Sequence, residues 1–384
     1  MKRRTLIHEF ITTLANGDIK TAVEQLTILT DTADDYALPG EFLRLNCEAL
    51  QKNNWDVLSQ AFVNEEFIGP EGEFLIVAPY TARRQARKET LLTAIYGKVL
   101  PYEVLPDLSK VVDEIQGPLK EPIGRIMSFR RFASCGMVGT EGGEAFLVPD
   151  DWGFKDSHRA PALNDMTEQQ TRYMTAKRCI EIIFDMKSAN LLLESRKNGF
   201  DWMMLRHREY GFHDAGHSTG LGLKTKLGND LLPTPWYRGV EEWRADGIEF
   251  ELLRQTLSEC ETGRTIAANL SLRLGLDAHR EGGVERDTDV VAAQLALDAL
   301  LESGALEISA DRKLGFTNPT YEGLVEASHE HRSRAIQLTR DELALQYQQG
   351  IWGLYGSIKI SKASRVLLQG LVIDPCKGVF QNLH

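Results

Sequence analysis

The sequence is poor in cysteine. Its 384 residues include five cysteines, and no two of them form a Cys-x-x-Cys pair. Because the cysteines are odd in number and far apart, both a disulfide framework and a cysteine-rich zinc site are disfavoured. We therefore expect free thiols and a cytoplasmic protein.

The sequence also lacks long apolar runs and an excess of positive charge. No run approaches the roughly 20 apolar residues that span a bilayer. The opening MKRRTLIHEFITTLANGD has the apolar spacing of a helix rather than the continuous apolar core of a secretory signal. A formal net charge of -11 repels phosphate backbones. We expect a small-molecule substrate and neither a nucleic-acid nor a membrane partner; the sequence leaves the oligomeric state open.

Hydrophobic residues make up 42% of the chain and charged residues 26%, which is typical of a folded chain with a large core. Helical spacing of apolar residues covers 3–63, 167–194 and 287–304, and the segment 84–97 also looks helical. Short apolar runs at 73–79 and 144–149 indicate strands, and 305–317 indicates a hairpin. These patterns predict a mainly α-helical fold with a minor β component.

We expect three regions along the chain. Residues 1–115 form an N-terminal helical region, and 116–280 form a catalytic metal-binding domain. Residues 281–384 form a C-terminal helical tail, in which a helix followed by a hairpin suggests a winged-helix-like arrangement.

Two histidines stand four residues apart in the string GFHDAGHSTGLGL, on a helix expected to begin near Asp201. Positions i and i+4 lie on the same face of a helix, so His213 and His217 can reach one ion. Two neutral imidazoles suit zinc, iron, nickel or copper. Gly220 and Gly222 are expected to end this helix.

A second string, VEEWRADGIEFELL, follows Thr234-Pro235, a typical helix start. Glu242, Asp246 and Glu249 lie on one stripe of that helix, whereas Glu241 lies about 100° away from Glu242. The 24 residues between His217 and Glu242 allow the second helix to return antiparallel to the first. Two histidines and one carboxylate leave an open coordination position, as in catalytic metal sites. Asp246, or Glu241, would orient a histidine ligand from behind.

The strings HDAGH, STG and EEWRAD resemble those of the gluzincin metallopeptidases, in particular the dipeptidyl peptidase III branch. The resemblance covers about 35 residues, 213–247. It implies that His213, His217 and Glu242 bind Zn2+ and that the protein hydrolyses a small peptide- or amide-like substrate with a metal-activated water.

This sequence departs from the family pattern in two ways. One residue fewer separates the two histidines, and Asp214 stands where those peptidases have a glutamate that acts as general base. The shorter aspartate places its carboxylate about 1.5 Å further back, so Asp214 would act directly or through one water. Tyr210 and Arg238 flank the two motifs and are candidates for stabilising the developing oxyanion.

Three alternatives remain open at this point. Two histidines and one carboxylate also describe the Fe2+ site of non-haem oxygenases, which need no glutamate base. His213-Asp214 can instead be the HD dyad of metal-dependent phosphohydrolases, with a further His and Asp supplied by His158 or His207 and by Asp287 or Asp289. That interpretation leaves EEWRAD unexplained. The third alternative is a protein without enzymatic activity, whose metal is absent or structural.

Overall fold

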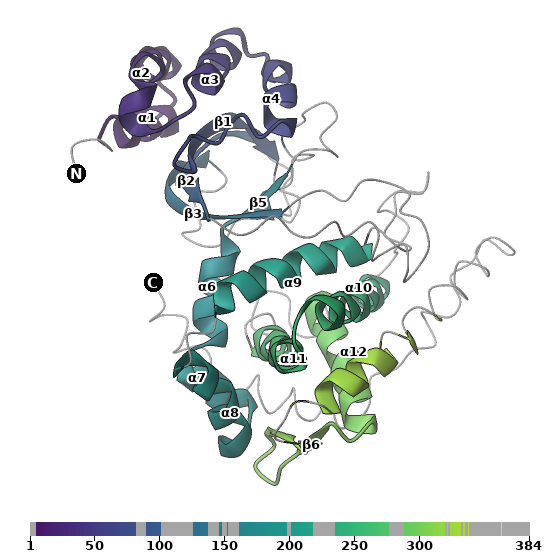
Figure 1. The fold of residues 1–384 in the computed structure, drawn as a ribbon. Helices are drawn as coiled ribbons and strands as arrows, with labels where there is room; N and C mark the ends of the chain where they lie inside the picture. The colour runs from purple at the N-terminus through teal and green to yellow at the C-terminus, as the bar shows by residue number, and fades with distance from the viewer. Residues whose placement is uncertain are drawn as a thin grey trace, which may run out of the picture. The chain divides into compact units, whose positions relative to one another are not determined.

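The computed structural model describes residues 5–81, 90–100, 126–136, 146–147, 152, 161–197, 201–217, 235–275, 288–318, 321, 323–331, 333–334, 337 and 362. Within these residues helices dominate, and two small sheets supply the strands (Figure 1). The predicted fold class, mainly α-helical with a minor β component, is confirmed.

The chain divides into two compact units. One consists of Met1–Val104 with Gly124–Gln169, and the other of Leu105–Ile123 with Gln170–His384. The region boundaries expected from the sequence, at 115 and 280, lie outside the described residues. The three-region organisation therefore stays a prediction.

The first unit begins with the helices that the sequence predicts over 3–63. They are α1 (Thr5–Ala15), α2 (Ile19–Asp31), α3 (Gly40–Lys52) and α4 (Ser59–Val63), with short 3-10 turns at Ala33–Tyr36 and Trp55–Leu58. Gly17 adopts a φ of +77° in the turn between α1 and α2. The Asp18 side chain then accepts a hydrogen bond from the Thr21 N–H at 3.1 Å and so caps α2.

A five-stranded sheet completes this unit. Its strands are β1 (Glu73–Thr81), β2 (Thr90–Val99), β3 (Ile126–Cys135), β4 (Phe146–Leu147) and β5 (Ala162–Asn164), in the order β1-β2-β3-β5-β4. Successive side chains of β1 alternate between two apolar clusters: Phe74 and Ile76 join one, and Leu75 and Val77 join the other. Both faces of β1 are therefore buried, which explains its nearly continuous apolar sequence.

The expectation of a helix over 84–97 is wrong where the structure describes it. Residues 90–97 belong to β2, which pairs antiparallel with β1 from Glu73↔Lys98 to Thr81↔Thr90; residues 82–89 lie outside the described residues. The segment is a strand because it pairs with β1. The spacing of apolar residues within the segment carries no information about that partner. The strands expected at 73–79 and 144–149 appear as β1 and as the two-residue β4.

The helical stretch expected over 167–194 is present but is not continuous. The segment forms three helices, α6 (Met166–Met174), α7 (Lys177–Ile183) and α8 (Met186–Lys197). The chain is extended at Ala176 and at Phe184, where α7 begins and ends. At the second break the Asp185 N–H donates to the Leu314 carbonyl at 2.8 Å, so a contact with a distant strand interrupts the helix.

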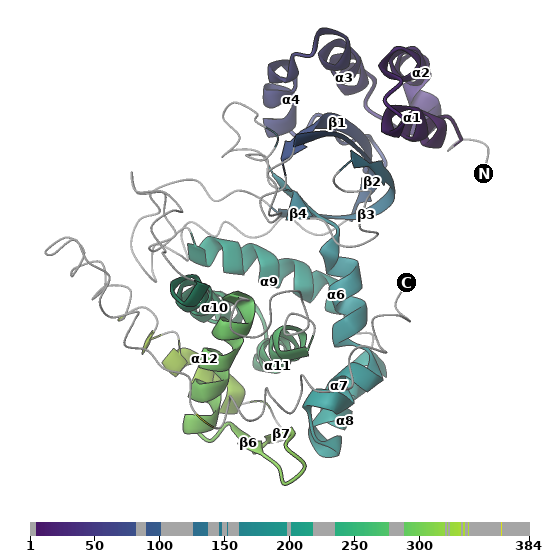
Figure 2. The ribbon, with the colours of Figure 1, turned by 180° about the vertical axis from the view of Figure 1, so that it is seen from behind.

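The remaining elements carry the candidate site. They are α9 (Trp202–His217), α10 (Pro235–Thr256), α11 (Glu259–Gly275) and α12 (Thr288–Glu302), followed by the hairpin of β6 (Leu306–Ile308) and β7 (Leu314–Phe316), which is visible in Figure 2. Asp201 caps α9 by accepting from the Met204 N–H at 2.9 Å. The helix predicted over 287–304 and the hairpin predicted over 305–317 are confirmed; the winged-helix-like arrangement stays a prediction.

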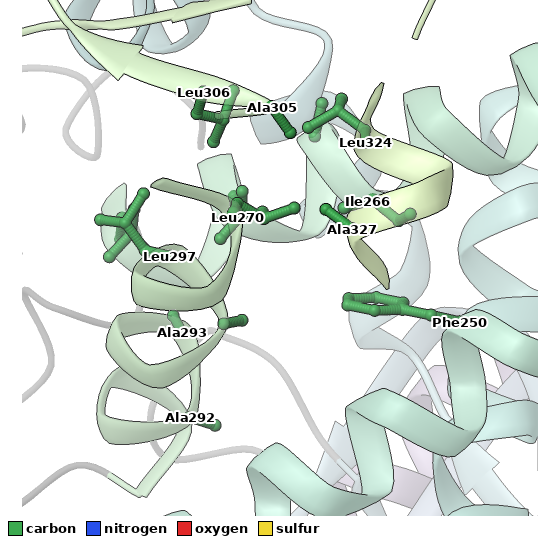
Figure 3. Packing of buried hydrophobic residues seen from close by; sticks show 14 of the residues in the cluster. Phe250, Ile266, Leu270, Ala292, Ala293, Leu297, Ala305, Leu306, Leu324 and Ala327 are labelled. Atoms are coloured by element: carbon green, nitrogen blue, oxygen red, sulfur yellow. The ribbon is translucent and has the colours of Figure 1, made fainter. Parts of the chain in front are cut away.

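Apolar side chains from several helices meet in the core of the second unit, which contains Gln170–His384 (Figure 3). Phe250 of α10, Ile266 and Leu270 of α11, and Ala293 and Leu297 of α12 all belong to it. The core fixes α10 against α11 and α12, the helices that carry the polar residues described below. None of the described helices is both long and apolar enough to cross a bilayer.

Candidate metal centre

Helices α9 and α10 approach each other closely at Gly216. A Cβ atom added there would lie 2.7 Å from the carbonyl oxygen of Ala245 and 2.9 Å from its Cα, closer than the 3.0 Å that real Cβ atoms keep. Arg244 fastens the same crossing, because its Nη2 donates to the Gly216 carbonyl at 2.8 Å. Glycine at 216 thus lets the turn of α9 that carries His213 lie against α10.

The structure brings His213 together with two carboxylates of α10. His213 Nε2 lies 2.9 Å from Glu242 Oε2, and Nδ1 lies 2.9 Å from Asp246 Oδ1. Glu242 and Asp246 are four residues apart and so occupy the same face of α10. Asp246, which we expected to orient a histidine ligand, thus contacts the His213 ring, and that orienting role stays a prediction.

Each nitrogen of the His213 ring therefore faces a carboxylate oxygen. Burial disfavours the charged ring, but the hydrogen bonds to Asp246 and Glu242, together with the nearby carboxyl group of Glu249, raise the pKa of His213 well above its ordinary value. A neutral imidazole has one N–H and one lone pair. If the N–H points to one carboxylate, the lone pair points at the other, and a proton or a metal ion must lie between them.

Asp246 also binds a guanidinium group. Its Oδ1 accepts from Arg273 Nη2 at 2.8 Å, in addition to His213. Burial opposes its ionisation, but the charge of Arg273 and the hydrogen bond from His213 hold the pKa of Asp246 below its ordinary value. Asp246 is therefore a carboxylate, which accepts from Nδ1 and leaves Nε2 for the side of Glu242.

A second pair of acids lies deeper in the unit. Glu249, on α10, places its Oε2 3.7 Å from His213 Nδ1, and Glu209 of α9 is bridged to it by Asn269, whose Nδ2 lies 2.7 Å from Glu209 Oε1 and 3.5 Å from Glu249 Oε1. Burial, and then the negative charge of Glu209, raise the pKa of Glu249 to about 8. Arg206 pairs with Glu209 and supplies a compensating positive charge.

Glu241 does not face His213 in the way that Glu242 does. It forms a two-pronged ion pair with Arg244, with Nε–Oε2 at 2.9 Å and Nη2–Oε1 at 2.6 Å. Arg244 is fully buried and Glu241 is 3% exposed. Glu241 thereby fixes the Arg244 guanidinium, which donates to the Gly216 carbonyl of α9. Its role is therefore to stabilise the packing of α10 against α9.

Of the other residues expected at the site, the structure describes the surroundings of some and not the side chains of others. Asp214 follows His213 on α9 and is partly buried. The Tyr210 hydroxyl donates to Gln170 Oε1, and its ring lies under the Arg206 guanidinium, 4.1 Å from ring centre to Cζ. The side chains of His217 and Arg238, and all of Gly220 and Gly222, lie outside what the structure describes. Their roles stay predictions.

The HD-dyad interpretation gains no support from the residues that the structure describes. Asp289, one of its candidate metal ligands, accepts from Arg273 Nη1 at 2.8 Å. His207 is buried on α9, and His158 and Asp287 lie outside the described residues.

Sequence reasoning missed Glu209, Asn269 and Arg273. Asn269 and Arg273 are four residues apart in a buried stretch of α11, and Arg273 Nε donates to Asn269 Oδ1 at 2.9 Å. The sequence signal that could have identified Asn269 and Arg273 is a polar pair at helical spacing within a largely apolar stretch. Which carboxylate they would meet depends on how α11 packs.

The residues around His213 fit a divalent cation. Nitrogen and carboxylate oxygen are zinc ligands at about 2.0–2.2 Å, which keeps two ligands of a tetrahedral ion roughly 3.3 Å apart; the 2.9 Å between His213 Nε2 and Glu242 Oε2 is a little less. A second group offers three ligand atoms within 4.8 Å of one another, one each from His213, Asp246 and Glu249. On that side Arg273 already supplies positive charge, so the Glu242 side fits an ion better.

Comparison with known proteins gives a family and several solved structures of similar fold. The family described as "Family of unknown function (DUF6014)" matches residues 1–273. No curated protein matches the sequence.

Solved structures that share the fold include two dipeptidyl peptidases III. Dipeptidyl peptidase III from Caldithrix abyssi superposes with a TM-score of 0.65 at 15% identity, covering 97% of this chain and 73% of that chain. Dipeptidyl-peptidase III from Corallococcus sp. strain EGB superposes with a TM-score of 0.55 at 15% identity, covering 96% and 70%. At this identity the likeness concerns the fold.

Proposed function

The chain belongs to the DUF6014 family of unknown function, and from its site and its fold we propose that it is a metal-dependent hydrolase of a small peptide- or amide-like substrate. The observation that carries the proposal is the pair of 2.9 Å contacts of His213, one from each ring nitrogen to a carboxylate. The likeness to two structures named dipeptidyl peptidase III supports a peptide-like substrate.

We assign the metal ligands to His213, His217 and Glu242, with Zn2+ as the preferred ion. Glu242 is 23% exposed in its side chain, whereas Asp246 is 2% exposed, so Glu242 is the carboxylate that water and substrate can approach. Asp246 accepts the Nδ1–H of His213, which fixes the tautomer and aims Nε2 toward Glu242.

The bound ion would supply Lewis acidity, lowering the pKa of a water molecule to about 7 and polarising the carbonyl under attack. Asp214, next to His213 on α9, would serve as the general base. Because its carboxylate sits about 1.5 Å further back than that of a glutamate, Asp214 would act through an intervening water. Arg238 is the candidate for stabilising the developing oxyanion, and Tyr210 would join it only after its hydroxyl releases Gln170 Oε1.

Metal analysis of the full chain, purified without chelators, tests the proposal. We expect about one equivalent of zinc and cleavage of a panel of dipeptidyl chromogenic amides that stops after chelation and returns with Zn2+. Iron in place of zinc would assign the same ligands to an oxygenase. A protein that binds no ion and cannot be loaded would overturn the proposal.

The role of Asp214 is tested separately. Asp214→Asn is expected to keep the metal and lose hydrolysis, whereas Asp214→Glu is expected to raise peptidase activity because the longer side chain reaches the water directly. Unchanged turnover in Asp214→Asn would reject the acid–base role and leave the metal centre in place.

A further inference from the structure

Asp246 is held from two directions at one oxygen. Its Oδ1 accepts from His213 Nδ1 at 2.9 Å and from Arg273 Nη2 at 2.8 Å, and the residue is 1% exposed. A carboxylate with a single partner can rotate about its last bond. The second donor, which comes from a different helix, fixes the plane of the carboxylate and so the direction from which it meets the imidazole.

Arg273 is itself tightly placed. Its Nε donates to Asn269 Oδ1 at 2.9 Å, one turn earlier on α11, and its Nη1 donates to Asp289 Oδ1 at 2.8 Å, in the first turn of α12. With Nη2 on Asp246, the planar guanidinium contacts acceptors on three helices. Three anchors in one rigid plane leave the group little freedom, which a lysine ammonium on a flexible stem cannot reproduce.

We propose that Arg273 is a positioning residue for the metal centre: it fixes the Asp246 carboxylate, and Asp246 in turn holds His213 with Nδ1 as donor and Nε2 directed at Glu242. The inference rests on the proposed function. Arg273 does not contact the ion; it transmits the packing of α11 and α12 to one ligand on α9.

The positive charge of Arg273 and its positioning of Asp246 have opposite expected effects on metal affinity. A positive group near a metal centre repels the ion, so as a charge alone Arg273 would weaken metal binding. As a positioning group it strengthens binding, because loss of a residue behind a metal ligand costs typically 10–100-fold in affinity. Arg273→Lys keeps the charge and removes the three-way geometry, and it therefore separates the two effects.

The experiment is a Zn2+ titration of the metal-free full chain against a competing chelator. Arg273→Lys is compared with the wild type and with Arg264→Lys, the same change on the same helix, where the Arg264 Cζ lies 5.8 Å from the centre of the Tyr321 ring. The absorption spectrum of the Co2+-loaded protein reports the ligand geometry directly. Circular dichroism and melting of the metal-free proteins show whether each variant folds.

We expect Arg273→Lys to bind Zn2+ at least about tenfold more weakly and to shift the Co2+ bands, with Arg264→Lys unchanged in both. An affinity within twofold of the wild type and an unshifted spectrum would overturn the inference while the metal centre stands. If Arg273→Lys does not fold, Asp289→Ala takes its place: it removes the acceptor of the Arg273 Nη1 hydrogen bond, and it must weaken Zn2+ binding as well. If the wild type binds no ion, the proposed function fails and this inference with it.

Discussion

Replacing Gly216 by alanine tests whether the crossing of α9 and α10 sets the geometry around His213. The new Cβ would lie 2.7 Å from the Ala245 carbonyl oxygen, and ordinary contact begins at 3.4 Å. The helices must therefore separate by about 0.7 Å, the difference between these two distances. Backbone atoms of α10 are the obstacle, so a change of side-chain rotamer cannot absorb the displacement.

Stability and metal affinity respond differently to this change. Alanine gains about 1 kcal/mol of helix propensity over glycine, and overpacking costs about 1–3 kcal/mol, so the net destabilisation is about 0–2 kcal/mol. Functional constellations tolerate about 0.5 Å of displacement. The separation exceeds this tolerance, so we expect Gly216→Ala to fold and to bind Zn2+ at least about tenfold more weakly.

Gly263→Ala is the matched control. It is also a glycine-to-alanine change in a helix, and its Cβ would lie 2.4 Å from the Cβ of Tyr321, at a different contact. We expect a similar change in the free energy of unfolding, measured by urea denaturation, with unchanged Zn2+ affinity. Zn2+ affinity equal to that of the wild type in Gly216→Ala would refute the argument that this crossing positions the metal ligands.

Two further predictions concern stability. Glu241→Gln leaves the fully buried Arg244 without its carboxylate partner, and we expect a loss of about 3–5 kcal/mol in urea denaturation; a loss below about 1 kcal/mol would contradict the buried ion pair. His331 is stacked on Trp243 with ring centres 4.8 Å apart, and burial lowers its pKa to about 4. Since the unfolded chain takes up this proton near the ordinary value of 6.5, stability falls as the pH drops from 6.5 toward 4, by about 3 kcal/mol in total. His331→Gln should reduce this pH dependence, and an unaltered stability–pH curve would disprove the assignment.

Local spacing predicted those parts of the site that lie within single helices. His213 and His217 are four residues apart, as are Glu242 and Asp246. The structure places the two histidines on α9 and the two carboxylates on α10. Helix periodicity depends on near neighbours, so the sequence reports it directly. The same reason explains why α12, with its apolar run ending before Gly304, was predicted correctly.

Contacts between distant segments decided the rest. The strand β2 owes its conformation to pairing with β1, and the break after α7 coincides with a hydrogen bond to Leu314. Neither partner can be read from the spacing inside the segment. Helix propensity and strand propensity are weak preferences that tertiary pairing overrides.

The helical character of the chain, and the histidines and carboxylates available for a metal, follow from the order of the amino acids. The packing of distant helices places Asp246 at Nδ1 and Glu242 at Nε2 of His213. It also brings Arg273, 27 residues after Asp246, to the same Asp246 oxygen. Helical spacing determines which side chains share a face. How closely two faces approach depends on packing at points such as Gly216, where a single added carbon would separate them.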